Sequence, residues 1–173
     1  MDNRFIIPLN GLAAGENRFF WHVGKEFFDG FDNTEVLESQ LDIEVVAEKS
    51  GRYIGIDCAV HGCVVVECDR CMEDLEMPVD VDIMLSVKFS DSGSSDEVSD
   101  NDREVIFVPA DDTDLDLGQI VYDYVCTSLP MQRMHEDGEC NPDALRYLGT
   151  KETSDVVSPS DGNPFSALKG MFE

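Results

Sequence analysis

Hydrophobic residues alternate with polar ones along much of this chain, and that alternation constrains the fold more than any other feature. The cleanest example covers residues 79–89, where apolar side chains occupy every second position, and similar patterns cover 41–47 and 54–60. A period of two places successive side chains on opposite faces of a strand. Strands with one buried face and one hydrated face are typical of an antiparallel sheet.

Shorter patterns predict further elements around this sheet. Apolar runs at 5–7, 63–66 and 105–108 are candidate strands, as is 18–23 with Phe19, Trp21 and Val23 on one face, and 34–39 is a candidate short helix. The dipeptides Ser50-Gly51 and His61-Gly62 have the composition of hairpin turns. The aromatic residues near the N-terminus are predicted to belong to the core: Phe19, Phe20, Trp21, Phe27, Phe28 and Phe31.

The spacing becomes helical in the last third of the chain. Apolar residues recur at positions 117, 120, 121, 124 and 125, and this helix must end before Leu129-Pro130. Asp116 followed by Gln119 resembles a capping box at its start. The predicted fold class is therefore α+β: an antiparallel sheet, which could close in part into a barrel, followed by helices.

The domain organisation follows from composition. Residues 1–150 are predicted to form a single α+β domain, interrupted by a mobile acidic loop at 91–104 that has few apolar residues. A polar linker is expected at 151–162. A short helical tail is expected at 163–173, because Asn163-Pro164 combines an N-cap residue with proline at the first helical position.

The charge of the chain narrows the classes of function. There are 37 Asp and Glu against 12 Lys and Arg, a net charge of −25, whereas 42% of the residues are hydrophobic and can supply a core. Nucleic-acid binding depends largely on basic side chains that neutralise phosphates, so direct binding is not expected. The chain has no apolar run long enough to cross a membrane and no signal peptide at its start, and we expect a cytoplasmic protein.

Four residues could form a metal site. Cys68 and Cys71 have the spacing of a metal-binding turn, and His135 and Cys140 form a second pair beyond the predicted helix. Structural zinc is one interpretation, and reduced cysteines without metal are another. A redox pair is the third, but the acidic residues around the turn are expected to disfavour the thiolate. Three further cysteines lie in apolar patterns and are expected to act as small hydrophobic residues: Cys58, Cys63 and Cys126.

No hydrolytic or phosphate-binding motif is present, so we do not expect an enzyme. One family does share several motifs with this chain. The segment from Cys68 to Met72 resembles the Cys-x-Arg-Cys-Leu signature of the YceD-like family, the large ribosomal RNA subunit accumulation proteins. The resemblance continues in order through Leu129-Pro130-Met131, His135 with Cys140, and the final Asn163–Leu168 segment, and covers about residues 40–172.

The resemblance implies a bacterial factor that supports accumulation or processing of 23S ribosomal RNA, without catalytic activity. It also implies metal binding by Cys68, Cys71, His135 and Cys140. Because an acidic protein repels phosphates and attracts basic proteins, we expect a basic large-subunit ribosomal protein or a pre-50S particle as partner. Two alternatives remain at this point: a thiol-disulfide protein that uses Cys68 and Cys71, and a general acidic adaptor or nucleic-acid mimic.

Overall fold

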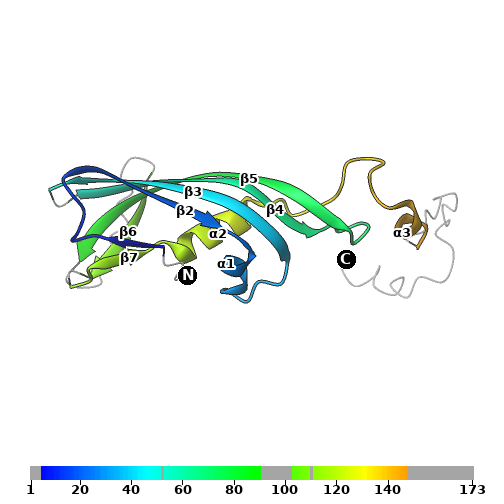
Figure 1. Cartoon of the computed structure of the whole chain (residues 1–173), viewed down its shortest axis with the longest axis horizontal. Coiled ribbons are helices and arrows are strands. Elements are labelled where there is room, and N and C mark those ends of the chain that lie inside the picture. The colour runs from blue at the N-terminus through cyan, green and yellow to red at the C-terminus, as the bar shows by residue number, and fades with distance from the viewer. Residues whose placement is uncertain (1–4, 52, 91–102, 110, 148–173) are drawn as a thin grey trace, which may run out of the picture. The chain divides into compact units, whose positions relative to one another are not determined.

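The computed structural model describes residues 5–51, 53–90, 103–109 and 111–147. The chain divides into two units, Met1–Cys140 and Asn141–Glu173. The larger unit is built on a five-stranded sheet with the order β2-β3-β4-β5-β6, accompanied by a two-stranded sheet of β1 and β7 (Figure 1). The elements of this unit are β1 (Ile6–Pro8), β2 (Gly15–Val23), α1 (Lys25–Asp29), β3 (Val36–Ser50), β4 (Tyr53–Glu67), β5 (Asp74–Ser90), β6 (Glu104–Pro109), β7 (Asp114–Asp116) and α2 (Gly118–Ser128).

The five-stranded sheet is a meander with one added strand. Strands β2 to β5 pair antiparallel in sequence order, as the alternation predicts. Strand β6 pairs parallel to β5, opposite residues 85–90. Among the described strands, β2 and β6 remain the two edges of an open sheet. The α+β class is confirmed, but partial closure into a barrel is wrong, because β6 extends the sheet beyond β5 instead of pairing with β2.

One face of the sheet forms the core. Figure 1 shows α1, α2 and the β1–β7 pair on the same side of the sheet, which we call the inner face. The apolar residues of β3, β4 and β5 that point there are buried, and they pack with Val121 and Val125 of α2 and with Phe28 of α1. The inner-face residues include Leu41, Ile43, Val45, Ala47, Ile56, Cys58, Val60, Ile83, Leu85 and Val87.

The aromatic cluster is only partly in this core. Phe27 and Phe28 are buried, and Phe19, Trp21 and Phe31 are partly buried against the core. Phe20 is 65% exposed, so its assignment to the core is wrong. It alternates with Phe19 and Trp21 along β2 and therefore points to the opposite face, which we call the outer face.

Helix α2 occupies the range that the helical spacing predicts and ends before Leu129-Pro130. Its N-terminus differs from the predicted capping box. The Asp116 carboxylate accepts a hydrogen bond from the Gly118 N–H at 2.8 Å. The Gln119 amide instead donates to Asp123, one turn further along the helix, at 2.8 Å.

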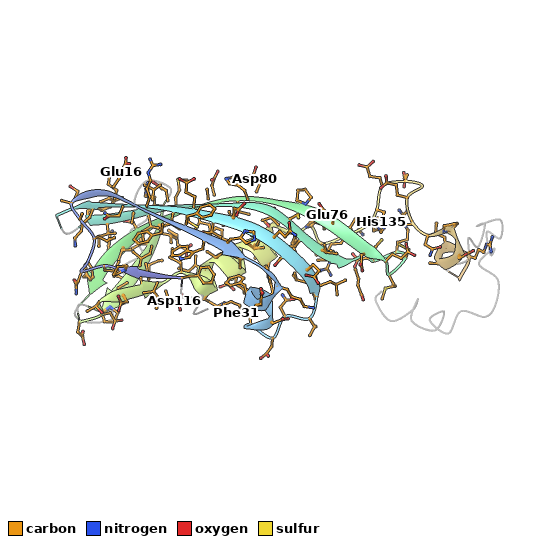
Figure 2. The ribbon with its side chains drawn as sticks, viewed as in Figure 1. Glu16, Phe31, Glu76, Asp80, Asp116 and His135 are labelled. Carbon is orange, nitrogen blue, oxygen red and sulfur yellow. The ribbon has the colours of Figure 1, made fainter. Side chains whose placement is uncertain are left out.

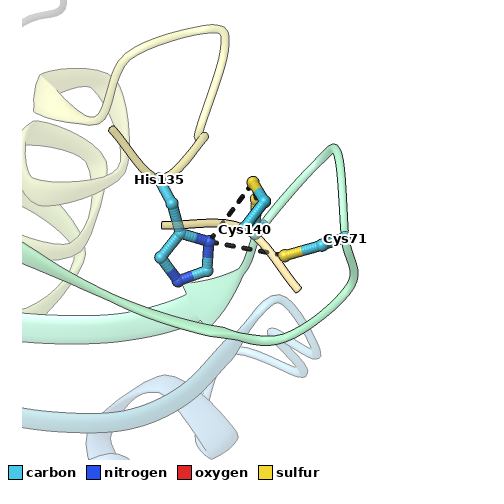
Figure 3. Close-up of side chains that lie close together, drawn as sticks. Cys71, His135 and Cys140 are labelled. Carbon is cyan, nitrogen blue, oxygen red and sulfur yellow. Dashed lines mark hydrogen bonds between the residues drawn. The ribbon is translucent and has the colours of Figure 1, made fainter. Parts of the chain in front are cut away.

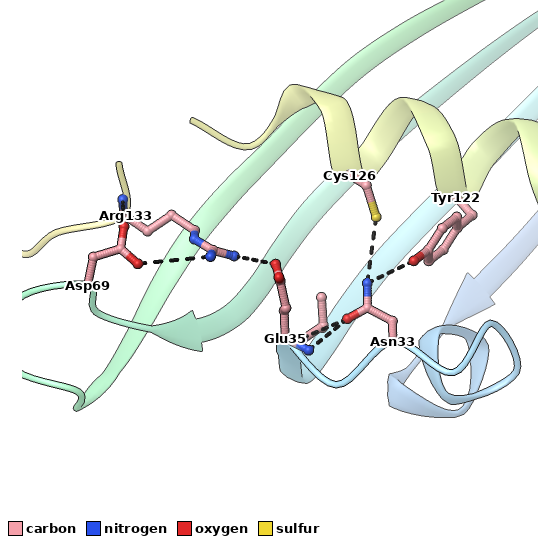
Figure 4. Close-up of polar contacts among 7 residues, drawn as sticks. Asn33, Glu35, Asp69, Tyr122, Cys126 and Arg133 are labelled. Carbon is pink, nitrogen blue, oxygen red and sulfur yellow. Dashed lines mark hydrogen bonds and ion pairs between the residues drawn. The ribbon is translucent and has the colours of Figure 1, made fainter. Parts of the chain in front are cut away.

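The short helix predicted at 34–39 is wrong, because β3 already begins at Val36. The Asn33 side-chain oxygen accepts hydrogen bonds from the N–H groups of Glu35 (2.8 Å) and Val36 (3.1 Å), as Figure 4 shows. The Asn33 amide also donates to the Tyr122 hydroxyl of α2 at 3.0 Å. This side chain therefore fixes the turn into β3 and joins it to α2.

Of the two predicted hairpin turns, one is confirmed. Gly51 lies between β3 and β4 with φ of +63°. His61-Gly62 is not a turn, because β4 continues through it. A Cβ atom at Gly62 would lie 2.0 Å from the Gln40 carbonyl oxygen, so glycine here permits two strands to approach closely.

The smaller unit contains α3 (Pro142–Tyr147) in its described part. The Asn141 side-chain oxygen accepts a hydrogen bond from the Asp143 N–H at 2.9 Å, so Asn141 is the N-cap. Asn141-Pro142 carries the same start signal as Asn163-Pro164, and the sequence prediction missed it.

Most of the acidic loop (91–102), the linker (151–162) and the tail (163–173) lie outside the described residues and stay predictions. The predicted extent of the single domain, residues 1–150, also stays a prediction. Glu104, at the end of the predicted loop, begins β6. None of the described helices is long and apolar enough to span a membrane.

Candidate metal centre

The connection between β4 and β5 carries the first two candidate ligands. The Cys68 N–H donates to the Glu73 carbonyl, and the Met72 N–H donates to the Cys68 carbonyl, both at 2.9 Å. Met72 adopts a φ of +62°, which is unusual for a residue with a side chain. This tight turn holds Cys68 and Cys71 together, with 0% and 5% of their surfaces exposed.

The second pair of ligands lies beyond α2 and is attached to this turn through Asp69 and Arg133. The Asp69 N–H donates to the Arg133 carbonyl, and the Arg133 N–H donates to the Asp69 carboxylate, both at 2.7 Å. The Arg133 guanidinium also binds Glu35 at 2.9 Å (Figure 4). These contacts join segments that are 64 residues apart in the chain and bring His135 and Cys140 to the turn.

The four predicted ligands converge on one point. The Cys71 sulfur lies 3.4 Å from His135 Nδ1, and the Cys140 sulfur lies 3.9 Å from the same nitrogen (Figure 3). The Cys68 and Cys140 sulfurs are 3.9 Å apart, and all four donor atoms lie within 4.8 Å of one another. A tetrahedral zinc ion with Zn–S bonds of about 2.3 Å places its donor atoms about 3.8 Å apart. The cluster could therefore hold a metal ion, and its spacing suits a tetrahedral one.

The orientation of His135 suits a ligand. Its Nε2 lies 3.1 Å from the Asp74 carbonyl oxygen, so Nε2–H can donate there and leave the Nδ1 lone pair directed at the sulfurs. A hydrogen bond from the second ring nitrogen to a carbonyl is the usual support for a metal-binding histidine. A hydrogen bond with the Cys68 sulfur raises the pKa of His135, so a metal ion at this position competes with a proton.

The electrostatic environment of Cys68 differs from the prediction. Burial acts to raise the pKa of this thiol, but backbone N–H groups of His135, Arg70 and Cys71 point at the sulfur and lower the pKa to about 6. The expectation that the surrounding acids disfavour the thiolate is therefore wrong for Cys68. The Asp69 carboxylate binds Arg133 instead, and the Cys68 sulfur receives backbone donors.

Arg70, inside the Cys-x-x-Cys turn, supports the second ligand pair. Its Nε donates to the Cys140 sulfur at 3.0 Å and its Nη2 donates to the His135 carbonyl at 2.9 Å. The Asp137 carboxylate lies further away, at 3.7 Å. Burial raises the pKa of Cys140, and the Arg70 hydrogen bond acts in the opposite direction. Arg70 therefore offsets part of the negative charge of the thiolate cluster.

The other cysteines and histidines lie outside the cluster. Cys58 is buried in the sheet, where burial raises its pKa to about 12. Cys63 and Cys126 are half-buried. His22 and His61 lie on β2 and β4 and contact Asp42 and Asp80 at 2.9 Å. Cys58 is therefore the buried small hydrophobic residue that the sequence predicts, whereas Cys63 and Cys126 are only partly buried.

Sequence reasoning found the four donors but not the residues that hold them. The Asp69–Arg133 contacts and the Asp74 carbonyl carry no local signal, because their partners lie more than sixty residues away. Arg70 stands out in the sequence as the only basic residue inside the turn. That its hydrogen bonds go to the Cys140 sulfur and the His135 carbonyl could not be inferred from the sequence.

Of the comparisons with known proteins, the scan against protein families finds a match. The family model described as large ribosomal RNA subunit accumulation protein YceD matches residues 56–172, more than half of the 173-residue chain and a range that includes all four candidate ligands. No curated protein and no solved structure matches the chain. The extent of the family match is sufficient for the assignment: the chain belongs to the YceD family of large ribosomal RNA subunit accumulation proteins.

Proposed function

We propose that this protein is a non-enzymatic factor that supports accumulation of 23S ribosomal RNA and biogenesis of the large ribosomal subunit in the cytoplasm. Family membership links the chain to large-subunit ribosomal RNA. The finer part of the proposal is that it acts by binding a basic ribosomal protein, alone or in a pre-50S particle. The observation that carries this part is the net charge of −25.

The charge favours a protein partner over RNA. Each phosphate contact normally needs a lysine or arginine, and the basic residues here are outnumbered threefold, 12 against 37 acids. Several of the basic side chains already contact acids of this chain, such as Arg103 with Asp57 and Arg133 with Glu35. Ribosomal proteins are basic, so long-range attraction would speed their association with this surface.

The cysteine cluster supports a structural role for zinc in this factor. Three sulfurs and one nitrogen form a donor set that suits structural zinc, with no donor position left for a substrate. The ion would join the β4–β5 turn to the segment beyond α2. Metal analysis of protein prepared without chelator should find close to one zinc per chain, and less than about one tenth of an equivalent would contradict this part.

The thiol-disulfide alternative has less support. The lowered pKa of Cys68 suits a reactive thiolate as well as a ligand. However, Cys68 is 0% exposed and Cys71 is 5% exposed, so a disulfide substrate could not reach the sulfurs in this conformation. We expect no insulin-reductase activity from the metal-loaded protein. Catalytic reduction of insulin would support the thiol-disulfide alternative instead.

The binding proposal is tested by comparing three probes at physiological salt. The purified, metal-loaded protein is mixed with separated large-subunit proteins, with naked 23S RNA, and with hen lysozyme as an unrelated basic protein. We expect tight binding to one or more large-subunit proteins and weak binding to the other two probes. Equal binding to RNA would contradict the choice of a protein partner. Equal binding to lysozyme would favour the general acidic adaptor instead.

A further inference from the structure

The outer face of the five-stranded sheet is strongly acidic. No described helix or strand of the larger unit packs on this face, and Figure 2 shows Glu16 and Asp80 on the side of the sheet away from α1 and α2. The exposed acids of this face, identified by their alternation along β2 to β5, are Glu16, Glu38, Asp42, Glu44, Glu48, Asp57, Glu67, Asp74, Glu76, Asp80 and Asp82. Among the described residues its basic side chains are Arg18, Lys88 and Arg103, and Arg18 and Arg103 already contact acids of the same face.

An apolar band crosses the middle of this acidic face. It consists of one residue from each of four neighbouring strands: Phe20, Val46, Ala59 and Met84. Phe20 is 65% exposed and Met84 is 46% exposed, whereas Val46 and Ala59 are half-buried. Diagonal positions on adjacent strands lie about 7–8 Å apart, within reach of long side chains such as Phe20 and Met84. We call these four residues the outer band.

Acidic residues alternate with the outer band in the strand register. Phe20 lies opposite Glu44, Val46 lies opposite Asp57, and Ala59 lies opposite Asp82. Apolar and charged side chains therefore alternate in two adjacent rows, Phe20–Glu44–Ala59–Asp82 and Arg18–Val46–Asp57–Met84. The band also contains a shallow hollow of about 280 Å³, lined by Glu44, Val46, Asp57, Cys58, Ala59, Asp82, Ile83 and Met84.

This pattern points to one kind of partner. Acids alone would attract any polycation, but an exposed phenylalanine and methionine among them favour a partner that also removes apolar surface from water. A nucleic acid is disfavoured because its phosphates would face the acids. The complementary ligand is a polypeptide segment in which basic and apolar side chains are interspersed.

We propose that the outer face, centred on the outer band, is the docking surface for an apolar and basic segment of the partner protein. Lysine or arginine side chains of the segment pair with exposed acids of this face such as Glu44 and Asp82, and its apolar side chains cover Phe20 and Met84. This inference rests on the proposed function, since it locates the binding of a basic protein on one face of the sheet.

The apolar part of the proposal is tested with two synthetic peptides of equal charge. One alternates lysine with leucine and the other alternates lysine with serine. We expect the wild-type protein to bind the lysine–leucine peptide at least about tenfold more tightly. The double variant F20S/M84S should lose most of this preference, while M131S, which alters a methionine that is 101% exposed elsewhere, should keep it. An unchanged preference in F20S/M84S would overturn the proposal.

The acidic part is tested by variants that preserve side-chain size. E44Q/D82N removes two charges beside the outer band, and D111N/D112N removes two exposed charges in the connection from β6 to β7. We expect E44Q/D82N to weaken binding of both peptides several-fold and to reduce its salt dependence. Equal effects of the two double variants would show attraction by net charge alone and would overturn the assignment to this face. Circular dichroism and zinc content establish that each variant is folded.

The same variants separate this inference from the proposed function. If the wild-type protein binds large-subunit proteins and F20S/M84S binds them equally well, the function stands and the docking surface is wrong. If the wild-type protein binds no large-subunit protein, or binds naked 23S RNA as well as it binds them, the proposed function itself fails. If F20S/M84S loses binding at least about tenfold while M131S does not, the docking surface is supported.

Discussion

The turns at the two ends of β4 both require a residue with positive φ, but different interactions stabilise them. Each contains a residue with a left-handed backbone conformation, Gly51 with φ of +63° and Met72 with φ of +62°. Gly51 has no neighbouring atom within 4 Å of a built Cβ, and glycine adopts this conformation without steric cost. Met72 is a less suitable residue, and its turn is held by Arg133 and by the metal-site residues instead.

The difference shows where the stability of each turn comes from. The Gly51 turn is encoded by adjacent residues and was predicted from them. The Cys68–Met72 turn is held in addition by hydrogen bonds to a segment more than sixty residues away, and by a metal ion in our proposal. The first turn should therefore respond to local substitutions, and the second should respond to loss of metal.

The largest expected effect is loss of a ligand at the second turn. Cys71→Ser should lower the stability of the zinc-loaded protein by about 3 kcal/mol or more, because folding is coupled to metal binding in sites of this type. Chelator should lower the melting temperature of the wild-type protein and leave the variant unchanged. Cys63→Ser, on β4 and outside the cluster, is the matched control. If chelator does not change the melting temperature of the wild-type protein, a bound metal does not stabilise the second turn.

The next effect concerns Arg70. Arg70→Met removes the hydrogen bonds to the Cys140 sulfur and the His135 carbonyl, and loss of such supporting contacts typically weakens metal binding about 10- to 100-fold. Competition with a chromophoric chelator measures the zinc affinity. Arg18→Met, which alters an exposed arginine of β2, should leave it unchanged. Equal affinities for the two variants would show that the Arg70 hydrogen bonds do not support the metal ligands.

A smaller effect is expected at the first turn. Gly51→Ala should lower the free energy of unfolding by about 1 kcal/mol, because alanine is strained at this positive φ. Gly51→Asn should cost less, since asparagine tolerates the left-handed region. Urea denaturation measures both variants, and their zinc affinity should equal that of the wild type. Reduced zinc affinity would show that the two turns are coupled through the sheet.

The smallest effect should have the opposite sign. Met72→Gly removes an unfavourable backbone conformation from a side chain that is 68% exposed, and should raise stability by up to about 1 kcal/mol, reduced by the greater freedom of glycine in the unfolded chain. Met72→Val should lower stability, because a β-branched residue is strained further at this φ. If Met72→Gly is clearly destabilising, the turn needs the methionine side chain for packing.

The fold was largely predictable because its main signals are local. The alternation at 41–47, 54–60 and 79–89 corresponds to β3, β4 and β5, and the helical spacing corresponds to α2. The errors have particular causes. The Asn33 side chain fixes an extended start for β3, and Gly62 permits close approach of two strands. Neighbouring aromatic residues along β2 do not reveal which of them points to the solvent, so Phe20 was wrongly assigned to the core.

The candidate site was predictable in its ligands but not in its construction. The Cys-x-x-Cys spacing and the family resemblance identified the four donors, which the structure brings together. The Asp69–Arg133 contacts and the hydrogen bond from His135 to Asp74 depend on tertiary structure, so no local pattern contains them. The outer band could likewise not be predicted, because its four residues come together only through the register of four strands.

The separation of the ligands along the chain has a consequence for the order of folding. Cys68 and Cys140 are 72 residues apart, whereas the strands of the β2–β5 meander pair with their neighbours in sequence. Short-range pairings form early because they close small loops, so we expect the metal cluster to be completed late, after α2 has docked. Contacts absent from the folding transition state slow unfolding and scarcely affect the folding rate. Zinc shortage would then shorten the lifetime of the folded protein without delaying its formation.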